Sequence, residues 1–196
     1  MFLRTESFRE FLRFYPVVSL ILFIHLLVFL ATTLPILPSK EIFALLAGVN
    51  LYIVEGEIWR LFTPIFTHSG FTHLLFNSFS LVLFAPALER MLGPGKFIAI
   101  YLLTGISANI ATLLLEPLTY IHVGSSGAIF GLFGFYISMI MFRKDLLSKV
   151  NSQTILTIAV ISVIMTFVQP NINITAHIFG LIAGFLTGRI FFTRRR

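Results

Sequence analysis

The chain has 196 residues, of which 57% are hydrophobic and 11% charged, and its formal net charge is +6. A soluble domain of this size could not bury so much apolar surface, so the composition indicates a membrane protein. The absence of cysteine excludes disulfides, thiolate chemistry and Cys-based metal sites. Because the basic residues lie in short connections between apolar runs, the positive charge does not indicate a nucleic-acid partner.

Six apolar runs are long enough, or nearly so, to cross a bilayer as helices that rise ~1.5 Å per residue. We therefore expect an all-α polytopic membrane protein with six transmembrane helices, at residues 16–37, 71–92, 97–115, 126–142, 154–169 and 172–192. The first run is long for a signal peptide and is followed by no small-x-small cleavage site, which favours a retained span. The run from Ile42 to Val54 is too short to span the bilayer and is expected at its interface or in a re-entrant loop.

The basic residues predict the orientation of these spans. Lys40 and Arg60 fall on one side, whereas the other twelve of the fourteen Lys and Arg residues fall at the two ends and in alternate connections: Arg4, Arg9, Arg13, Arg90, Lys96, Arg143, Lys144, Lys149, Arg189, Arg194, Arg195 and Arg196. The positive-inside rule then places both termini in the cytoplasm. We expect short cytoplasmic tails at residues 1–15 and 193–196 around one six-span domain at 16–192, and the compact chain favours a prokaryotic inner (cytoplasmic) membrane.

Polar residues gather at one predicted depth. The second, fourth and sixth spans run from outside to inside, and they carry His73 with Asn77, Ser126, and His177 near their starts. All four therefore fall in the outer half of the membrane, where polar side chains mark a functional site by default. The fourth span would be only ~25 Å long. The segment before Ser126 must then dip into the membrane as irregular backbone, which is tolerated beside a water-filled cavity.

Ser126 lies in the frame Gly124-Ser125-Ser126-Gly127 at the predicted start of the fourth span. A serine there could cap the helix or provide a small residue at a helix contact. It could also act as a nucleophile, because the free backbone N–H groups of a helix start can hold an oxyanion. From the sequence alone, Ser125 is a rival candidate for that role.

His177 is the natural general base for such a serine, although a histidine hydrogen-bonded across helices is the simpler alternative. Glycines repeat every fourth position in the helix of His177, at Gly180, Gly184 and Gly188, and Gly127, Gly131 and Gly134 fit close packing of the helix of Ser126 against a neighbour. Pairing of these faces would bring His177 to Ser126. No Asp or Glu lies at this depth, so we expect a Ser-His dyad whose histidine is oriented by packing, with Phe130 available as the packing ring.

His73 and Asn77 are four residues apart and share one helix face. Two side-chain donors aimed at one cavity could stabilise a tetrahedral oxyanion. The alternatives are a structural hydrogen-bonding pair or part of a zinc site with His68 and His177. No HExxH helix and no carboxylate at that depth supports zinc, so we expect neither a metal nor another cofactor. His25 and His122 are interpreted as structural, although His122 is near enough to the serine motif to matter.

Together these residues resemble the rhomboid family of intramembrane serine proteases, over about Trp59 to Gly188. The resemblance rests on Trp59-Arg60, His73 with Asn77, Gly124-Ser125-Ser126-Gly127, and Ala176-His177 with Gly180. It implies a six-helix rhomboid-like bundle in which Ser126, rather than Ser125, is the nucleophile and His177 the base. It further implies that His73 and Asn77 are oxyanion donors, that Trp59 and Arg60 are structural, and that His68 is a polar position near the cavity. Many members carry Tyr where Phe130 stands here.

The resemblance implies a serine endopeptidase that cleaves transmembrane proteins near the outer membrane face. The expected partners are transmembrane protein substrates and the lipid bilayer, without nucleic acid, and the oligomeric state stays open. One alternative is a non-catalytic rhomboid-like factor that binds membrane proteins. Another is a small transporter or channel, which would be expected to show paired ionisable residues or an inverted repeat.

Overall fold

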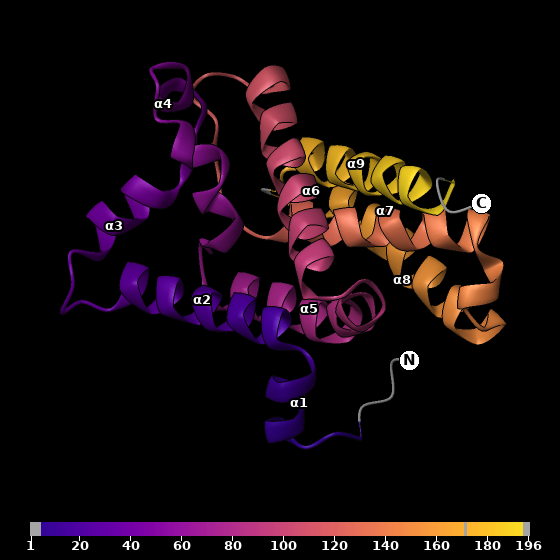
Figure 1. The fold of residues 1–196 in the computed structure, drawn as a ribbon. Coiled ribbons are helices and arrows are strands. Elements are labelled where there is room, and N and C mark those ends of the chain that lie inside the picture. The colour runs from indigo at the N-terminus through magenta and orange to yellow at the C-terminus, as the bar shows by residue number, and fades with distance from the viewer. Residues whose placement is uncertain (1–4, 171, 194–196) are drawn as a thin grey trace.

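The computed structural model describes residues 5–170 and 172–193, so the predictions for Arg4 and Arg194–Arg196 lie outside the described residues. The described chain is helical almost throughout, apart from one pair of two-residue strands, which confirms the all-α expectation (Figure 1). The elements are α1 (Phe8–Phe14), α2 (Pro16–Thr33), α3 (Ser39–Leu46), β1 (Gly48–Val49), α4 (Asn50–Val54), η1 (Ile58–Leu61), η2 (Thr63–Phe66), α5 (Phe71–Leu92), α6 (Pro94–Leu115), β2 (Ile121–His122), α7 (Ser126–Phe142), η3 (Lys144–Leu146), α8 (Lys149–Val168) and α9 (Ile174–Thr193).

Six of these helices correspond to the predicted spans. Within the described residues, α2, α5, α6, α8 and α9 are long and apolar enough to cross a membrane, and α7 is a shorter apolar helix of 17 residues. The expected limits 71–92 and 126–142 are reproduced as α5 and α7. The first span ends at Thr33 rather than at 37. Leu34 precedes Pro35, and a residue before proline is driven out of the helical region.

Two helices start earlier than their apolar runs. The helix α8 begins at Lys149, because the side chain of Ser148 accepts a hydrogen bond from the Asn151 N–H at 3.2 Å and so caps a polar first turn. The helix α6 begins at Pro94, a residue suited to the first helical position because its missing N–H would have no helical partner. Hydropathy alone does not report such starts.

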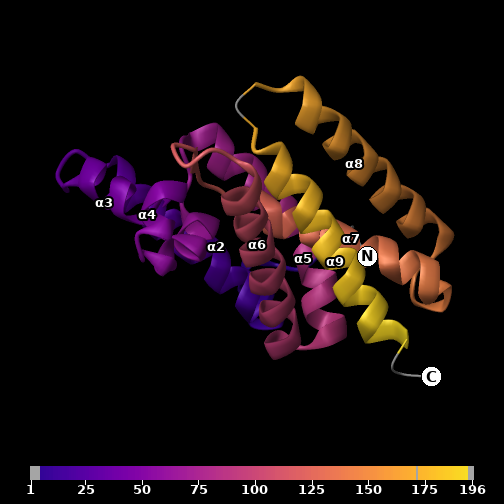
Figure 2. The same cartoon turned by 90° about the horizontal axis from the view of Figure 1, so that it is seen from above.

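The central helix of the bundle is α7. Twelve of its residues are buried, and its most extensive contact is with α9, followed by α6. The helix α8 contacts α7 and α9 and lies on the outside of the bundle, on the side away from α3 and α4 (Figure 2). The candidate residues Ser126 and His177 therefore belong to the two helices that share the largest interface.

Glycines allow α7 and α9 to touch through their backbones. A Cβ atom at Gly180 or Gly184 would overlap the carbonyl group of Gly127 or Gly131, and one at Gly134 would overlap the Leu181 carbonyl oxygen. We call this α7–α9 contact the glycine seam. Small residues let membrane helices approach in this way. The predicted pairing of the two glycine faces is thus confirmed.

A buried carboxylate joins the N-terminal helices to the bundle. Glu89 of α5 is buried, and its two carboxylate oxygens accept hydrogen bonds from the backbone N–H groups of Val17 and Val18, each at 2.9 Å. These N–H groups belong to the first turn of α2, where no helical partner exists. Glu89 therefore caps α2 from another helix and satisfies its own charge.

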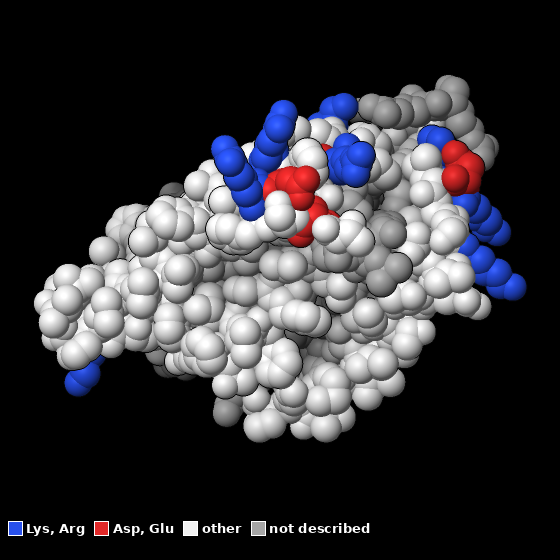
Figure 3. Space-filling model, turned by 90° about the horizontal axis from the view of Figure 1, so that it is seen from below, with Lys and Arg blue, Asp and Glu red and all other residues white. Residues whose placement is uncertain are grey.

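Charge is confined to part of the surface. On the face shown in Figure 3, Lys, Arg, Asp and Glu side chains gather along the upper and right margins, and a small basic spot lies at the left end. A broad uncharged area lies between them. Large apolar side chains are exposed along the spans, among them Phe79, Ile161 and Ile190. A surface of this kind suits a hydrocarbon solvent, so the fold is that of a polytopic membrane protein.

Candidate active site

The segment that leads into α7 is anchored from two sides. The strand β2 pairs with β1, so that His122 lies opposite Gly48, and the N–H of Gly124 donates to the Pro64 carbonyl at 2.8 Å. Gly124 has a φ of 115°, and a Cβ there would overlap the ring of His73. A glycine is therefore required both by the backbone conformation and by the close approach of the ring. This fixes the chain two residues before Ser126.

His122 fills the space above Gly48, where a Cβ atom would overlap its imidazole ring. Burial lowers the pKa of His122 to about 4, so the ring is neutral at pH 7. A neutral, buried ring packed on a glycine fits the structural role that was expected for it.

The two candidate serines differ in exposure. Ser126 is the first residue of α7 and is partly exposed, whereas Ser125 is fully buried. The first hydrogen bond of the helix runs from the Ile129 N–H to the Ser125 carbonyl at 3.0 Å. The N–H groups of Ser126 and Gly127 therefore precede the helical ladder and are available to a ligand. Ser126 therefore combines an accessible hydroxyl with nearby backbone N–H donors, whereas the Ser125 side chain is buried.

His177 lies against the first turns of α7. Its ring stacks on that of Phe130 with centroids 4.1 Å apart and an interplanar angle of 16°, which confirms the expected packing ring. Phe130 follows Ser126 by one helical turn. The glycine seam adds a backbone contact at the same level, since a Cβ on Gly127 would lie 3.5 Å from the Ala176 carbonyl oxygen. The structure therefore brings His177 and the start of α7 together.

One contact of His177 was missed by the sequence analysis. The Nδ1 atom of His177 lies 2.8 Å from the hydroxyl oxygen of Thr166 in α8, and both side chains are buried. A short connection joins α8 to α9, with Thr166 two residues before the end of α8 and His177 three residues after the start of α9. Residues placed in this way in a helical hairpin lie at the same depth, and this signal could have pointed to Thr166.

His73 and Asn77 lie on the first two turns of α5. The His73 ring covers Gly124, and its Nδ1 lies 3.1 Å from the hydroxyl oxygen of Ser69, a contact that the sequence analysis also missed. Asn77 is buried, and its amide donates one hydrogen bond to the His73 carbonyl at 2.9 Å. The structure thus brings His73 to the loop before Ser126, while Asn77 follows one turn further along the same helix.

Two further histidines extend this polar cluster away from α7. The His68 ring lies 4.7 Å from that of His25 in α2 and 5.1 Å from that of His73, measured between centroids. Burial lowers the pKa of His68, with smaller contributions from His25 and His73. Among the residues that the structure describes, no group of three or more His, Asp or Glu side chains is arranged to hold a metal ion.

Trp59 and Arg60 fasten the first long loop. The buried Arg60 guanidinium donates to the carbonyls of Ala44 and Ala47 at 2.5 and 2.6 Å, and its Nε donates to Glu57. The indole N–H of Trp59 donates to the Leu45 carbonyl at 3.3 Å. Both residues tie η1 to α3, which is the structural role expected for them.

The start of α9 is held to the end of α6. The Asn173 side chain accepts a hydrogen bond from the Ala176 N–H at 2.8 Å and donates one to the Thr112 hydroxyl at 2.9 Å. The Thr175 hydroxyl donates to the Glu116 carboxylate at 2.5 Å. These bonds fix the turn of α9 that carries His177.

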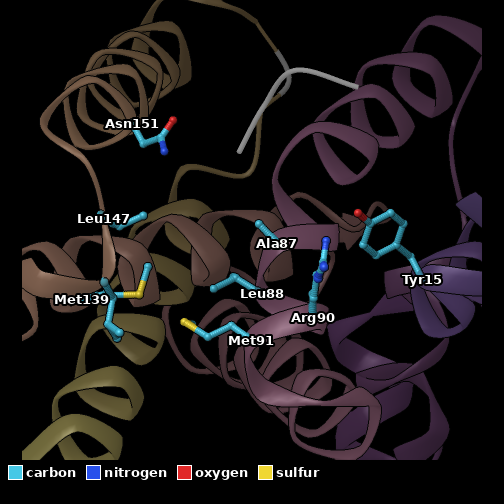
Figure 4. Close-up of a pocket in the computed structure, with 9 residues that line it drawn as sticks. Tyr15, Ala87, Leu88, Arg90, Met91, Met139, Leu147 and Asn151 are labelled. Carbon is cyan, nitrogen blue, oxygen red and sulfur yellow. The ribbon is translucent and has the colours of Figure 1, made fainter. Parts of the chain in front are cut away.

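A pocket of about 410 Å³ lies at the other end of α5 from His73 (Figure 4). Its lining includes Arg90 and Met91 from the last turn of α5, Met139 near the end of α7, and Tyr15. It contains none of the candidate catalytic residues. The chemistry suggested by Ser126 and His177 therefore belongs to the opposite end of the bundle.

The fold and site define a polytopic membrane protein with a candidate serine–histidine pair inside its bundle. A family model described as "Rhomboid domain" matches residues 55–194. The chain is 51% identical over 186 residues to the protein named "Putative rhomboid protease YdcA" of Bacillus subtilis (strain 168), which covers 95% of this chain and 94% of that protein. The chain belongs to the rhomboid family, and this membership supports intramembrane protease activity.

Two less similar relatives match about three quarters of this chain. The protein named "Rhomboid protease GluP" of Bacillus subtilis (strain 168) is 38% identical over 147 residues, 75% of this chain and 29% of that protein. "RHOMBOID-like protein 1" of Arabidopsis thaliana is 30% identical over 147 residues, 74% of this chain and 38% of that protein. The shared region is therefore only part of these longer proteins.

Proposed function

We propose that this chain is a serine endopeptidase that cleaves transmembrane proteins with a Ser126–His177 dyad. The observation that supports it most strongly is the stack of His177 on Phe130, because it sets a buried imidazole beside the first turn of the helix that begins with Ser126. A partly exposed hydroxyl, a histidine packed on the same end of its helix and free backbone N–H groups are the parts that acyl transfer requires.

In this mechanism the Ser126 hydroxyl oxygen attacks the scissile carbonyl carbon, and its proton passes to Nε2 of His177. The tetrahedral oxyanion then collapses, the C–N bond breaks, and His177 returns the proton to the leaving amine. Water attacks the resulting ester, again with His177 as base, and releases the acid and the free Ser126. In each half of the reaction His177 takes up one proton and gives it away again, so the dyad ends in its starting state.

The proposed oxyanion donors are His73, Asn77 and the backbone N–H of Ser126. The His73 ring covers Gly124, and its Nδ1 lies 3.1 Å from the Ser69 hydroxyl oxygen. We assign the Ser69 hydroxyl as the donor in this contact, which leaves Nε2–H as the donating edge of the ring. Asn77 has a second amide N–H besides the one bonded to the His73 carbonyl. Donors fixed before the reaction stabilise developing charge without reorganisation.

We further propose that cleavage occurs near the outer membrane face, from a six-span domain at 16–192 with cytoplasmic tails at 1–15 and 193–196. The positive-inside bias supports this orientation, in a prokaryotic inner membrane. Substrates would be transmembrane proteins whose helices unwind readily near that face, because a peptide bond locked in a helix is hard to reach. Helix-breaking residues near the scissile bond should therefore promote cleavage.

The test is cleavage of a single-span reporter by the purified protein in detergent. We expect Ser126→Ala and His177→Ala to abolish cleavage, while Ser125→Ala, the matched control, retains it. Equal cleavage by wild type and Ser126→Ala would remove Ser126 from the mechanism. A folded wild-type protein that binds but cleaves no transmembrane reporter would favour the non-catalytic alternative. Since the chain has no cysteine, single introduced cysteines in alternate loops can test the orientation by labelling.

A further inference from the structure

The hydroxyl of Thr166 has two neighbours of different kinds. Its oxygen lies 2.9 Å from the Ser162 carbonyl oxygen in its own helix α8 and 2.8 Å from Nδ1 of His177 in α9. Thr166 is 1% exposed and His177 is 7% exposed, so water does not compete freely for these bonds. The donor and acceptor roles can therefore be assigned by counting hydrogens.

A threonine hydroxyl has one hydrogen and two lone pairs. When the hydrogen is donated to the Ser162 carbonyl, which can only accept, the contact with His177 must use a lone pair of the hydroxyl oxygen. The ring must then supply the hydrogen, so Nδ1 is protonated. In neutral imidazole only one nitrogen carries hydrogen, which leaves Nε2 as the unprotonated acceptor.

We infer that Thr166 is a positioning residue that holds His177 in the tautomer whose bare Nε2 accepts the Ser126 proton. This inference rests on the proposed function, because it assigns a partner to the proposed base. An orienting group behind the base is a general requirement of a serine–histidine site, and a carboxylate is the common solution. Here a neutral hydroxyl, itself anchored to a helix carbonyl, occupies the position behind the imidazole.

The bond is not simply the local bond of a membrane threonine. Most threonine hydroxyls in the described spans donate to the carbonyl four residues earlier, as Thr187 does to Ala183 at 2.7 Å. Thr166 makes this local bond and in addition contacts a ring nitrogen in the next helix. Orientation of His177 therefore has two components, namely the Phe130 face below the ring and the Thr166 hydroxyl at its edge.

The kinetic test uses three variants in the reporter assay. Thr166→Val preserves shape and removes the hydroxyl, Thr166→Ser restores it, and Thr187→Val is the matched control for loss of a local hydroxyl bond. We expect Thr166→Val to lower kcat about tenfold or more with KM little changed, because a buried N–H is left without an acceptor. Thr166→Ser should recover kcat to within a few fold, and Thr187→Val should leave it near wild type.

The tautomer of His177 can be measured independently of the cleavage assay. Ring nitrogen-15 NMR of the full-length protein in lipid vesicles, with the His177 signals assigned from a His177→Gln variant, should show a protonated Nδ1 and a bare Nε2 at neutral pH. Thr166→Val should then show a mixture of both tautomers. A wild-type His177 protonated on Nε2 would overturn the inference, and so would an unchanged kcat in Thr166→Val.

The two proposals fail in different ways. Cleavage by Ser126→Ala would overturn the proposed function, whatever Thr166 does. An inactive Ser126→Ala beside a fully active Thr166→Val would leave the function intact and overturn only the role of Thr166. If Thr166→Val does not fold, the NMR signals of the wild type and the kinetics of Thr166→Ser still decide the matter.

Discussion

The helices α9 and α8 flank the same histidine but are held in opposite ways. The helix α9 meets α7 along the glycine seam, where backbone lies on backbone and an added methyl group would have no room. The helix α8 has three buried residues, Ile155, Ala159 and Thr166, and presents large apolar side chains outward along most of its length. His177 is carried by the first helix and receives one contact from the second.

This difference separates fixed from adjustable parts of the site. A backbone contact leaves no rotamer freedom and few alternative packings, so the seam determines where His177 and Ser126 lie relative to each other. A helix held by a few side chains can shift at a small cost in free energy. Lipid solvates its outer face equally well before and after such a shift. The Phe130 stack belongs to the fixed part and the Thr166 bond to the adjustable part.

The largest expected effect comes from breaking the seam. In Gly184→Ala the new Cβ would overlap the Gly131 carbonyl, and neither backbone can yield easily, so we expect a loss of about 3 kcal/mol in the free energy of unfolding. Thermal or denaturant-induced unfolding of the protein in mild detergent measures this loss in the free energy of unfolding. The matched control is Gly95→Ala, at a helical glycine with open space around it. Equal stability of the two variants would show that the seam is not tightly packed.

A smaller loss in the free energy of unfolding is expected from weakening the packing of α8 against the bundle. Ile155 is fully buried, and Ile155→Ala should cost about 2 kcal/mol, at the low end for such truncations, because α8 can move to close the cavity. Val160→Ala, on the outward face of the same helix, is the control and should change little. The same unfolding assay applies. A loss that exceeds that of Gly184→Ala would reverse the comparison between the two helices.

Much of the fold follows from the sequence, because hydrocarbon imposes simple rules. Apolar length predicted α5 and α7 at the residues where they lie, and the short α7 followed from the same count. Errors occurred where local chemistry outweighed hydropathy, as when Pro35 ended α2 early and Ser148 capped a polar turn of α8. The pairing of β1 with β2 joins segments about seventy residues apart and had no local signal.

The site was predictable to the extent that its contacts are periodic. Spacing of four residues placed Phe130 on the side of Ser126, and repeated glycines indicated which helices would meet. Thr166 and Ser69 were missed for a different reason. A hydroxyl in a membrane helix or a loop has many possible partners, most of them local, so its contact with a ring nitrogen depends on rotamers that only the packed structure fixes.

The smallest effect should come from removing the Phe130 ring, which supports His177 from the fixed part of the site. Phe130→Leu keeps an apolar side chain of similar burial and removes only the stacked ring, whose contribution in such pairs is about 1 kcal/mol. We therefore expect kcat in the reporter assay to fall by about tenfold at most, and the free energy of unfolding to fall by about 1 kcal/mol. Phe130→Tyr should keep wild-type turnover because the ring is retained. Since the seam still holds α9 against α7, the loss should not exceed that of Thr166→Val. A Phe130→Leu variant far less active than Thr166→Val would mean that the ring face, and not the α8 hydroxyl, fixes the imidazole, and the division between the two helices would have to be redrawn.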